Sequence, residues 1–264
     1  MRLNVASDAL APSLGLAADL MAVAEALHSQ YALRRSLSEP QASAEQLEHL
    51  VAALLGPVVS LAAADLIRVA VGQQWDSADA LSAAVRDQAI RLAWRATIED
   101  AQLEVARLGV LNLMLTARSN VALATAVGDP TRPLDEREAL VAAVIGEAHP
   151  LVALCAHSAV YDDRANFAGN LDHYLDELAR LGNRLRARVT TAIAMTPAQT
   201  DRMTTQLTRI YGRRIDVEAL VDERVIGGVR VDIGGDVIDG SLKARLETAR
   251  QALTSVPVRG PQGQ

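Results

Sequence analysis

The chain has 264 residues, half of them hydrophobic, and its 26 basic and 32 acidic residues give a formal net charge of −6. This composition supplies a buried core, and the negative charge disfavours a protein that binds the phosphate backbone of nucleic acids. The single cysteine excludes an internal disulfide, and the longest uncharged run, residues 50–64, is shorter than the about 20 residues of a membrane span.

Residues 1–185 are rich in alanine and leucine, and their apolar residues recur at intervals of three and four. This spacing places them on one face of a helix. Two such stripes are Leu47, Leu50, Val51, Leu54 and Leu55, and Leu171, Tyr174, Leu175 and Leu178. The pattern predicts a bundle of helices over residues 1–185.

This helical region contains an internal repeat with a period of 90 residues. Residues 31–63 align with residues 121–153 without a gap, and 11 of the 33 positions are identical. A repeat of this length indicates a duplicated structural unit. We therefore expect two related helical modules, at about 1–95 and 96–185.

Alanine bias explains some of these identities, but it does not explain the shared prolines and glycines. Pro40 aligns with Pro130, and Gly56 aligns with Gly146. Proline is common at helix starts and glycine at helix ends. The repeat therefore predicts equivalent helix boundaries in the two modules.

Charge and hydrophobic pattern both change near residue 185. Residues 1–185 hold 14 basic and 23 acidic residues, whereas residues 186–264 hold 12 and 9. Alternation of apolar and polar residues begins here, which predicts a strand with one solvent-exposed face. Its apolar positions are Ala187, Val189, Thr191 and Ile193. We expect a small α/β domain over residues 186–255 and a disordered tail over residues 256–264.

The next predicted helix begins after Thr196, because Pro197 follows and Gln199 completes a capping box; Gly212 ends it. A tight turn at Gly234 and Gly235 joins the last two strands. The remaining elements are strands with Ile215, Val217 and Ala219, with Val229, Val231 and Ile233, and with Val237 and Ile238, then a helix with Leu242, Leu246, Ala249 and Leu253.

No catalytic, cofactor or metal site is predicted. Neither Gly-Gly pair precedes the lysine of a phosphate-binding loop, and the five histidines form no pair at the spacing of a helical metal site. Cys155 and His157 are two residues apart, so their side chains diverge on a helix and cannot form a thiolate and its base. We expect Cys155 to be a core residue.

The segment 221–246 reads VDERVIGGVRVDIGGDVIDGSLKARL. An acidic turn and an aliphatic residue with two glycines precede an alternating strand, and a glycine, an Asp-Gly-Ser step and a basic helix follow it. This arrangement resembles the C-terminal signature of the ATP synthase delta subunit family, the bacterial counterpart of the oligomycin-sensitivity-conferring protein. We expect its marked residues to form turns and a helix cap rather than partner contacts. These residues are Gly227, Gly228, Gly234, Asp239, Gly240 and Ser241.

The resemblance implies a non-catalytic subunit of the F-type proton-transporting ATP synthase, in the peripheral stalk that acts as the stator during ATP synthesis. It implies that the helical region binds N-terminal segments of the alpha subunits and that the C-terminal domain binds the b-type stalk subunit. It further implies a peripheral protein on the cytoplasmic side of the cell membrane. The doubled helical region is similar to longer delta subunits of actinobacteria, some of which are fused to a membrane-anchored stalk helix; no anchor is expected here.

Three alternatives remain open. Repeated amphipathic helices also occur in adaptor or scaffold proteins unrelated to ATP synthase. A small α/β unit is found in RNA-binding KH domains, although the glycine pairs here lack a basic loop. Asp236 and Asp239 form a conceivable catalytic carboxylate pair, but no nucleophile or base accompanies them. The C-terminal signature favours the stalk subunit over all three.

Overall fold

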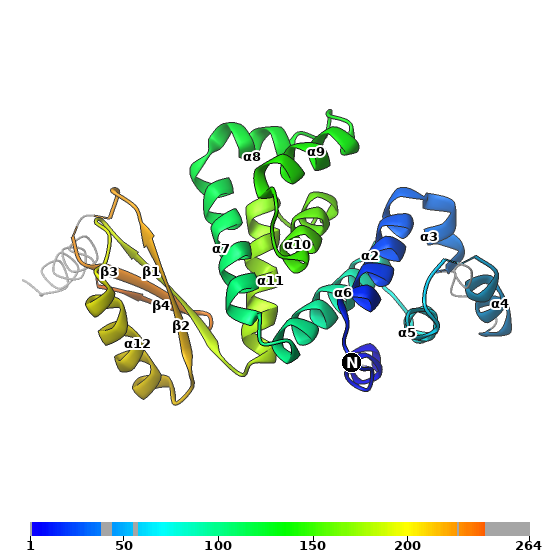
Figure 1. The fold of residues 1–264 in the computed structure, drawn as a ribbon, viewed down its shortest axis with the longest axis horizontal. Helices are drawn as coiled ribbons and strands as arrows, with labels where there is room; N and C mark the ends of the chain where they lie inside the picture. Colours follow the sequence, from blue (N-terminus) through cyan, green and yellow to red (C-terminus); the bar gives the residue numbers. More distant parts are fainter. Residues whose placement is uncertain (1, 38–43, 55–57, 226, 241–264) are drawn as a thin grey trace, which may run out of the picture. The chain divides into compact units, whose positions relative to one another are not determined.

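The computed structural model describes residues 2–37, 44–54, 58–225 and 227–240. Twelve helices and four strands lie within these ranges, and the chain divides into two compact units, Met1–Leu178 and Ala179–Gln264. The first unit is helical, and the second contains a small mixed sheet (Figure 1). The predicted fold class, mostly helical with a small C-terminal α/β part, is confirmed.

The helical unit is built from short and medium-length helices, several of which begin at a polar side chain. The Ser13, Ser60 and Ser77 hydroxyls and the Asn120 amide oxygen each accept a hydrogen bond from a backbone N–H three residues later. Such caps satisfy amides that lack a partner within the helix. The helices are α1 (Arg2–Asp8), α2 (Leu14–Ser29), α3 (Tyr31–Leu37), α4 (Ala44–Leu54), α5 (Leu61–Val71), α6 (Ala78–Glu99), α7 (Leu103–Ser119), α8 (Val121–Gly128), α9 (Leu134–Ile145), α10 (Pro150–Tyr161) and α11 (Phe167–Leu181).

The helix boundaries follow the 90-residue period. The bounds of α2, α3, α4 and α5 recur 90 residues later as those of α7, α8, α9 and α10, each to within one residue. The starts of α6 and α11 continue the series with the same agreement. Adding 90 to the bounds of α1 gives 92–98, which lie inside α6. One long helix, α6, therefore occupies the place of the last helix in the first series and of the first helix in the second.

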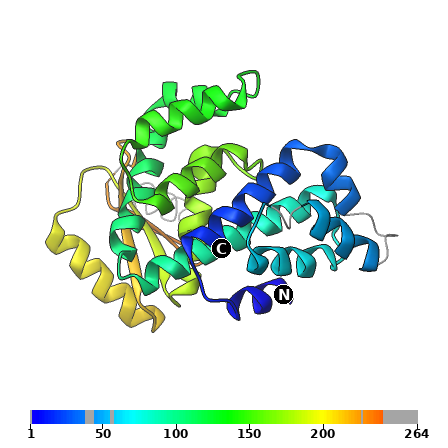
Figure 2. The ribbon, with the colours of Figure 1, turned by 45° about the vertical axis from the view of Figure 1, so that its right-hand side comes forward.

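The core of the helical unit forms around α6. Helix α2 packs along α6 (Figure 2). Both helices carry alanines and leucines that are almost fully buried, including Ala17, Leu20, Ala89 and Leu92. The Trp94 side chain is fully buried, and its Nε1 donates a hydrogen bond to the Tyr174 carbonyl at 3.0 Å. This bond ties α6 to α11 and satisfies the one polar atom of the indole.

The predicted helical features are largely confirmed where the structure describes them. The stripe at Leu171, Tyr174, Leu175 and Leu178 is buried on α11, and Cys155 is fully buried on α10, where burial raises the pKa of its thiol. Gly146 ends α9 with φ of 54°. Pro130, expected at a helix start, instead lies in the turn between α8 and α9, because Leu134 begins the next helix.

Some expected features lie outside the described residues or side chains. Pro40 and Gly56 belong to this group, so the helix boundaries expected there have no described counterpart. In the leucine stripe of α4, Val51 is buried and Leu50 is partly buried. Its other members are Leu47, Leu54 and Leu55.

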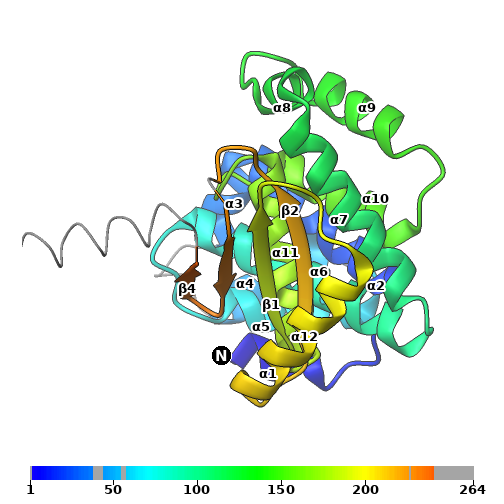
Figure 3. The same cartoon turned by 90° about the vertical axis from the view of Figure 1, so that its left-hand side faces the viewer.

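The second unit is a four-stranded sheet with one helix. Strand order is β2-β1-β3-β4; β1 and β2 are parallel, and the other neighbours are antiparallel (Figure 3). A parallel pair needs a crossover, which α12 provides between β1 and β2. The elements are β1 (Leu185–Thr191), α12 (Pro197–Tyr211), β2 (Ile215–Val221), β3 (Val229–Ile233) and β4 (Asp236–Asp239).

Local signals set the boundaries of this unit as predicted. Thr196 and Gln199 form the capping box of α12, and Gly212 ends the helix with φ of 67°. Gly234 and Gly235 both have positive φ in the turn between β3 and β4. The small core lies between α12 and the sheet and consists of Ala187, Val189, Leu207, Ile215, Val231 and Ile233. The helix expected after Ser241 and the tail after residue 255 lie outside the described residues.

Two expectations for β1 are wrong. The strand ends at Thr191, because its hydroxyl donates to the Ile193 carbonyl at 2.7 Å as the chain turns, and the Ile193 side chain is 79% exposed. The sheet face opposite the core is also not fully exposed to solvent. Arg186 is buried there and forms a bidentate ion pair with Glu218 of β2, with N to O distances of 2.8 and 2.7 Å.

Within the described part of the chain, no single helix is long and apolar enough to cross a membrane. Helices α7 and α8 together reach the length and composition of a span, but they are bent by 99° relative to one another. The bend lies at Asn120, which separates the two helices.

Candidate partner-binding surfaces

A groove of about 550 Å³ opens on the sheet unit between the end of β1, α12 and the start of β3. Its floor is mainly apolar: Met195 and Met203 reach it from the unit's core, and the exposed Ile193 stands beside them. Polar side chains surround this floor, namely Gln199, Arg202 and Gln206. An apolar centre with a polar rim is the usual arrangement of a protein-binding surface.

The first two signature glycines line this groove. Gly227 and Gly228 have φ of 64° and 80°, values that residues with a side chain rarely adopt. They turn the chain into β3 directly beside the apolar floor. Their position brings them to a surface that a partner can reach.

Gly234 and Gly240 lie at opposite ends of the β3–β4 hairpin. Gly240 donates its N–H to the Val229 carbonyl at 2.9 Å, and a Cβ at Gly240 would lie 3.1 Å from that oxygen. Gly234 has φ of 58° in the turn at the opposite end of the hairpin. Asp239 is exposed at the end of β4, opposite Arg230 in the strand register. Ser241 lies outside the described residues.

The fold therefore brings Gly227, Gly228 and Gly240 to one end of β3 and leaves Gly234 at the other. The groove residues Ile193, Met195 and Met203 were not singled out from the sequence as site residues. Their apolar side chains fit the core pattern of a strand and a helix equally well. Only the exposure of Ile193 next to the glycine pair distinguishes them.

A second groove, of about 450 Å³, lies on the helical unit between α2, α3, α4 and the segment before α5. Its described lining consists of apolar and small polar side chains without a charged group. Val58, 74% exposed, stands at its edge, and Leu33 and Leu50 are partly buried. Both grooves thus offer apolar area suited to the hydrophobic face of a helix.

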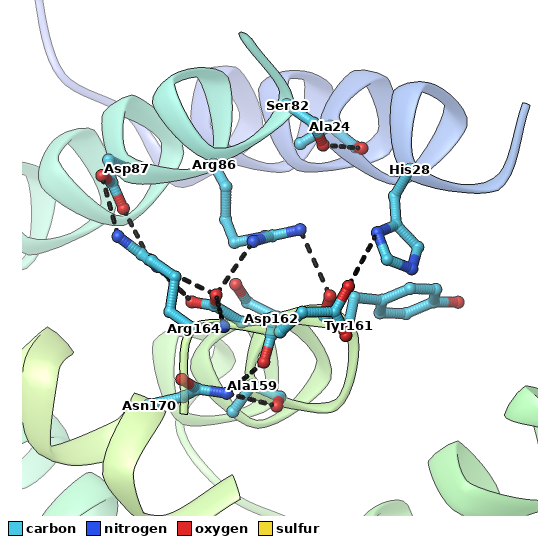
Figure 4. A network of polar contacts seen from close by, with 12 residues as sticks. Ala24, His28, Ser82, Arg86, Asp87, Ala159, Tyr161, Asp162, Arg164 and Asn170 are labelled. Carbon is cyan, nitrogen blue, oxygen red and sulfur yellow. Dashed lines mark hydrogen bonds and ion pairs between the residues drawn. The ribbon is translucent and has the colours of Figure 1, made fainter. Parts of the chain in front are cut away.

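A buried ionic network fixes the loop between α10 and α11 to α6. Asp162 accepts hydrogen bonds from Arg164, and it lies 3.1 Å from a guanidinium nitrogen of Arg86, while Arg164 also pairs with Asp87 (Figure 4). Burial opposes ionisation of Asp162, but the two arginines outweigh it and hold its pKa below the usual range. Charges paired in this way stabilise one arrangement of the helices.

Backbone groups of the same loop are held by Asn170 of α11. Its amide nitrogen donates to the carbonyls of Ala159 and Asp162 at 3.1 and 2.5 Å (Figure 4). The Tyr174 hydroxyl donates to the Asp162 carboxylate at 3.0 Å. The network therefore connects α6, α10 and α11 through the loop between α10 and α11.

The chain matches the family model described as ATP synthase delta (OSCP) subunit over residues 94–253. This range begins inside α6 and covers the second helical series and the sheet unit. The chain is 31% identical to the ATP synthase subunit delta of Cutibacterium acnes over 236 residues, which are 89% of this chain and 90% of the relative.

Two further relatives carry the same name. The protein of Kineococcus radiotolerans is 32% identical over 241 residues, 89% of this chain and 86% of the relative. That of Streptomyces avermitilis is 32% identical over 250 residues, 91% of this chain and 89% of the relative. Similarity over nine-tenths of the chain includes the first helical series, which precedes the range of the family model.

Proposed function

This chain belongs to the ATP synthase delta (OSCP) subunit family, and on that basis we propose how its two units share the binding of partners. The family is a non-catalytic part of the F-type proton-transporting ATP synthase, in its peripheral stalk. The chain is therefore a component of that membrane-bound complex, which excludes an unrelated adaptor, a KH domain or an enzyme.

We propose that the sheet unit binds the b-type stalk subunit through the groove at Gly227 and Gly228. The observation that carries this proposal is the apolar floor beside the signature glycines, with Ile193 79% exposed. The apolar face of a stalk helix fits such a groove, and methionines such as Met195 and Met203 adapt to its side chains. The polar rim orients the helix without a large desolvation cost.

We propose that the helical unit binds N-terminal segments of the alpha subunits, on the cytoplasmic side of the membrane. The groove between α2, α3 and α4 supports this because it offers uncharged apolar area to an amphipathic segment. The ionic network around Asp162 supports it as well, since a stator must resist torque without repacking its helices.

We further propose that the helical unit consists of two modules, at about 1–95 and 96–185, which arose by duplication. The 90-residue recurrence of helix boundaries supports this, as does the use of α6 by both series. Because the family model begins at residue 94, the second module is the one shared with the wider family. The groove between α2, α3 and α4 lies on the first module, which then adds its binding surface to the head-binding part.

The experiment uses full-length variants in which one exposed apolar residue becomes acidic. Ile193→Glu charges the sheet groove, and Val58→Asp charges the helical groove; Ile210→Glu, at a residue 68% exposed on α12, and Val121→Asp, at a residue 77% exposed, are matched controls outside both linings. Binding of each variant to purified catalytic head and to a soluble b-type stalk fragment is measured by cosedimentation and calorimetry.

Ile193→Glu should weaken stalk binding at least about tenfold, or about 1.4 kcal/mol, and leave head binding unchanged. Val58→Asp should show the reverse pattern. The controls should bind both partners like the unchanged protein. Loss of stalk binding in Val58→Asp, or full stalk binding in Ile193→Glu, would contradict the proposed division.

A further inference from the structure

Four polar side chains from three helices meet where α2 contacts α10 and α10 contacts α9 in the helical unit. They are Glu25 of α2, Glu138 of α9, and His157 and Tyr161 of α10, and we name them the His157 cluster. His157 Nε2 lies 3.1 Å from Glu25 Oε2, and His157 Nδ1 lies 3.3 Å from Glu138 Oε1. The Tyr161 hydroxyl donates to Glu25 Oε1 at 3.0 Å.

The geometry places a carboxylate oxygen beside each of the two nitrogens of the His157 ring. A neutral imidazole carries a hydrogen on only one nitrogen, so one of the two contacts of His157 sets a lone pair against a carboxylate oxygen. Glu138 Oε1 is shielded from solvent and accepts no hydrogen bond from any residue that the structure describes, despite its nearness to His157. A buried carboxylate oxygen without a donor requires a compensating group.

We propose that the His157 cluster binds a divalent transition-metal ion of the Zn²⁺ class. One nitrogen of His157 and one oxygen each of Glu25 and Glu138 lie within 4.8 Å of one another. In a tetrahedral zinc site, ligand atoms about 2.0–2.2 Å from the metal are about 3.4 Å apart. An ion on one nitrogen of His157 therefore requires the carboxylate beside the other nitrogen to turn toward it.

The ligand types and the exposure of the cluster agree with this class of ion. Imidazole with carboxylates suits zinc, whereas Ca²⁺ takes six to eight oxygen ligands. The His157, Glu25 and Glu138 side chains are 36%, 38% and 27% exposed, so an ion can enter from solvent and a water molecule can take the remaining position. Tyr161 then orients Glu25 as a neighbour of the ligand.

Such an ion would join the first helical series to the second, because Glu25 and His157 are 132 residues apart and belong to different series. The spacing of histidines along the chain could not reveal this cluster, since it contains only one histidine. Metal binding by the isolated chain does not depend on which partners the two units bind.

The test is a titration of the full-length chain, free of any histidine tag, with ZnCl2 in a calorimeter, and with CoCl2 in a spectrophotometer. We expect one ion per chain with a micromolar or lower dissociation constant, and visible absorption bands of four-coordinate cobalt. His157→Gln and Glu138→Gln should each weaken zinc binding at least about tenfold and abolish the cobalt bands. Glu136→Gln, on the exposed side of the same helix, is the matched control and should bind as the unchanged protein does.

A second measurement guards against variants that fold poorly. Zinc should raise the melting temperature of the unchanged chain and of Glu136→Gln, and it should leave that of Glu25→Gln unchanged. Zinc binding no tighter in the unchanged protein than in His157→Gln would overturn the proposal.

Discussion

The backbone breaks in the same way at Gln30 and at Asn120, which are 90 residues apart. The φ and ψ angles are −107° and 93° at Gln30 and −108° and 94° at Asn120. Each N–H donates to the carbonyl four residues earlier, and each carbonyl accepts from the N–H four residues later. Each residue therefore ends one helix and begins the next.

Exchange of the cap tests this equivalence. Asn120 Oδ1 accepts a hydrogen bond from the Leu123 N–H at 3.0 Å. With the same backbone angles, Gln30→Asn should cap the Leu33 N–H and stabilise the chain by about 0.5–1 kcal/mol, while Asn120→Ala should cost about 1 kcal/mol. Urea unfolding of both variants, with Gln30→Ala as control, measures the difference. Destabilisation by Gln30→Asn would show that the two breaks are not interchangeable.

The groove glycines should tolerate no β-branched residue. Gly228 has φ of 80°, so Gly228→Val should cost about 1–2 kcal/mol of folding free energy for this backbone conformation alone. Gly15→Ala is the control, because a Cβ there meets no atom within 4 Å and the position lies inside α2. That control should be neutral or stabilising. If Gly228→Val left the melting temperature and stalk binding unchanged, glycine would not be required at this position.

Two ion pairs between β2 and the segment that begins just before β1 should differ in their contribution to the free energy of unfolding. The Arg186 and Glu218 side chains are 6% and 3% exposed, whereas those of Arg184 and Asp216 are 33% and 21% exposed. Glu218→Gln removes the carboxylate charge that forms the bidentate pair with the buried Arg186 guanidinium, and it should cost about 3–5 kcal/mol. Asp216→Asn should cost less than about 1 kcal/mol. Equal losses for the two variants in chemical unfolding would show that burial does not set the difference.

The network around Asp162 should make the helical unit sensitive to acid. Burial opposes its ionisation, but Arg164 and Arg86 hold the pKa of Asp162 below its ordinary value of 3.8, so its ionised form stabilises the folded state at higher pH. That stabilisation is complete above the unfolded pKa and disappears as the pH falls through the folded pKa. Asp162→Asn should be less stable at pH 7 and lose less stability between pH 5 and 2. If Asp162→Asn lost as much stability as the unchanged protein between pH 5 and 2, the acid sensitivity would not come from Asp162.

Features encoded by neighbouring residues could be predicted from the sequence. The capping box of Thr196 and Gln199, the helix end at Gly212 and the turn at Gly234 and Gly235 depend on groups within a few residues of one another. The buried stripe of α11 follows from helical spacing, and the alternation in β1 follows from strand geometry. The signature that begins at Val221 likewise indicates the family through residue types and spacing alone.

The tertiary structure decided what depends on residues far apart in the chain. From the sequence, Arg186 is expected to face solvent, but the structure places Glu218 beside it. Ile193 is expected to be a core residue, but β1 ends before it. His157 has no local partner, yet folding brings Glu25 and Glu138 to its two nitrogens. Local hydrogen bonding and periodicity fix secondary structure, whereas the free energy of a buried charge or an exposed apolar side chain depends on which distant groups surround it.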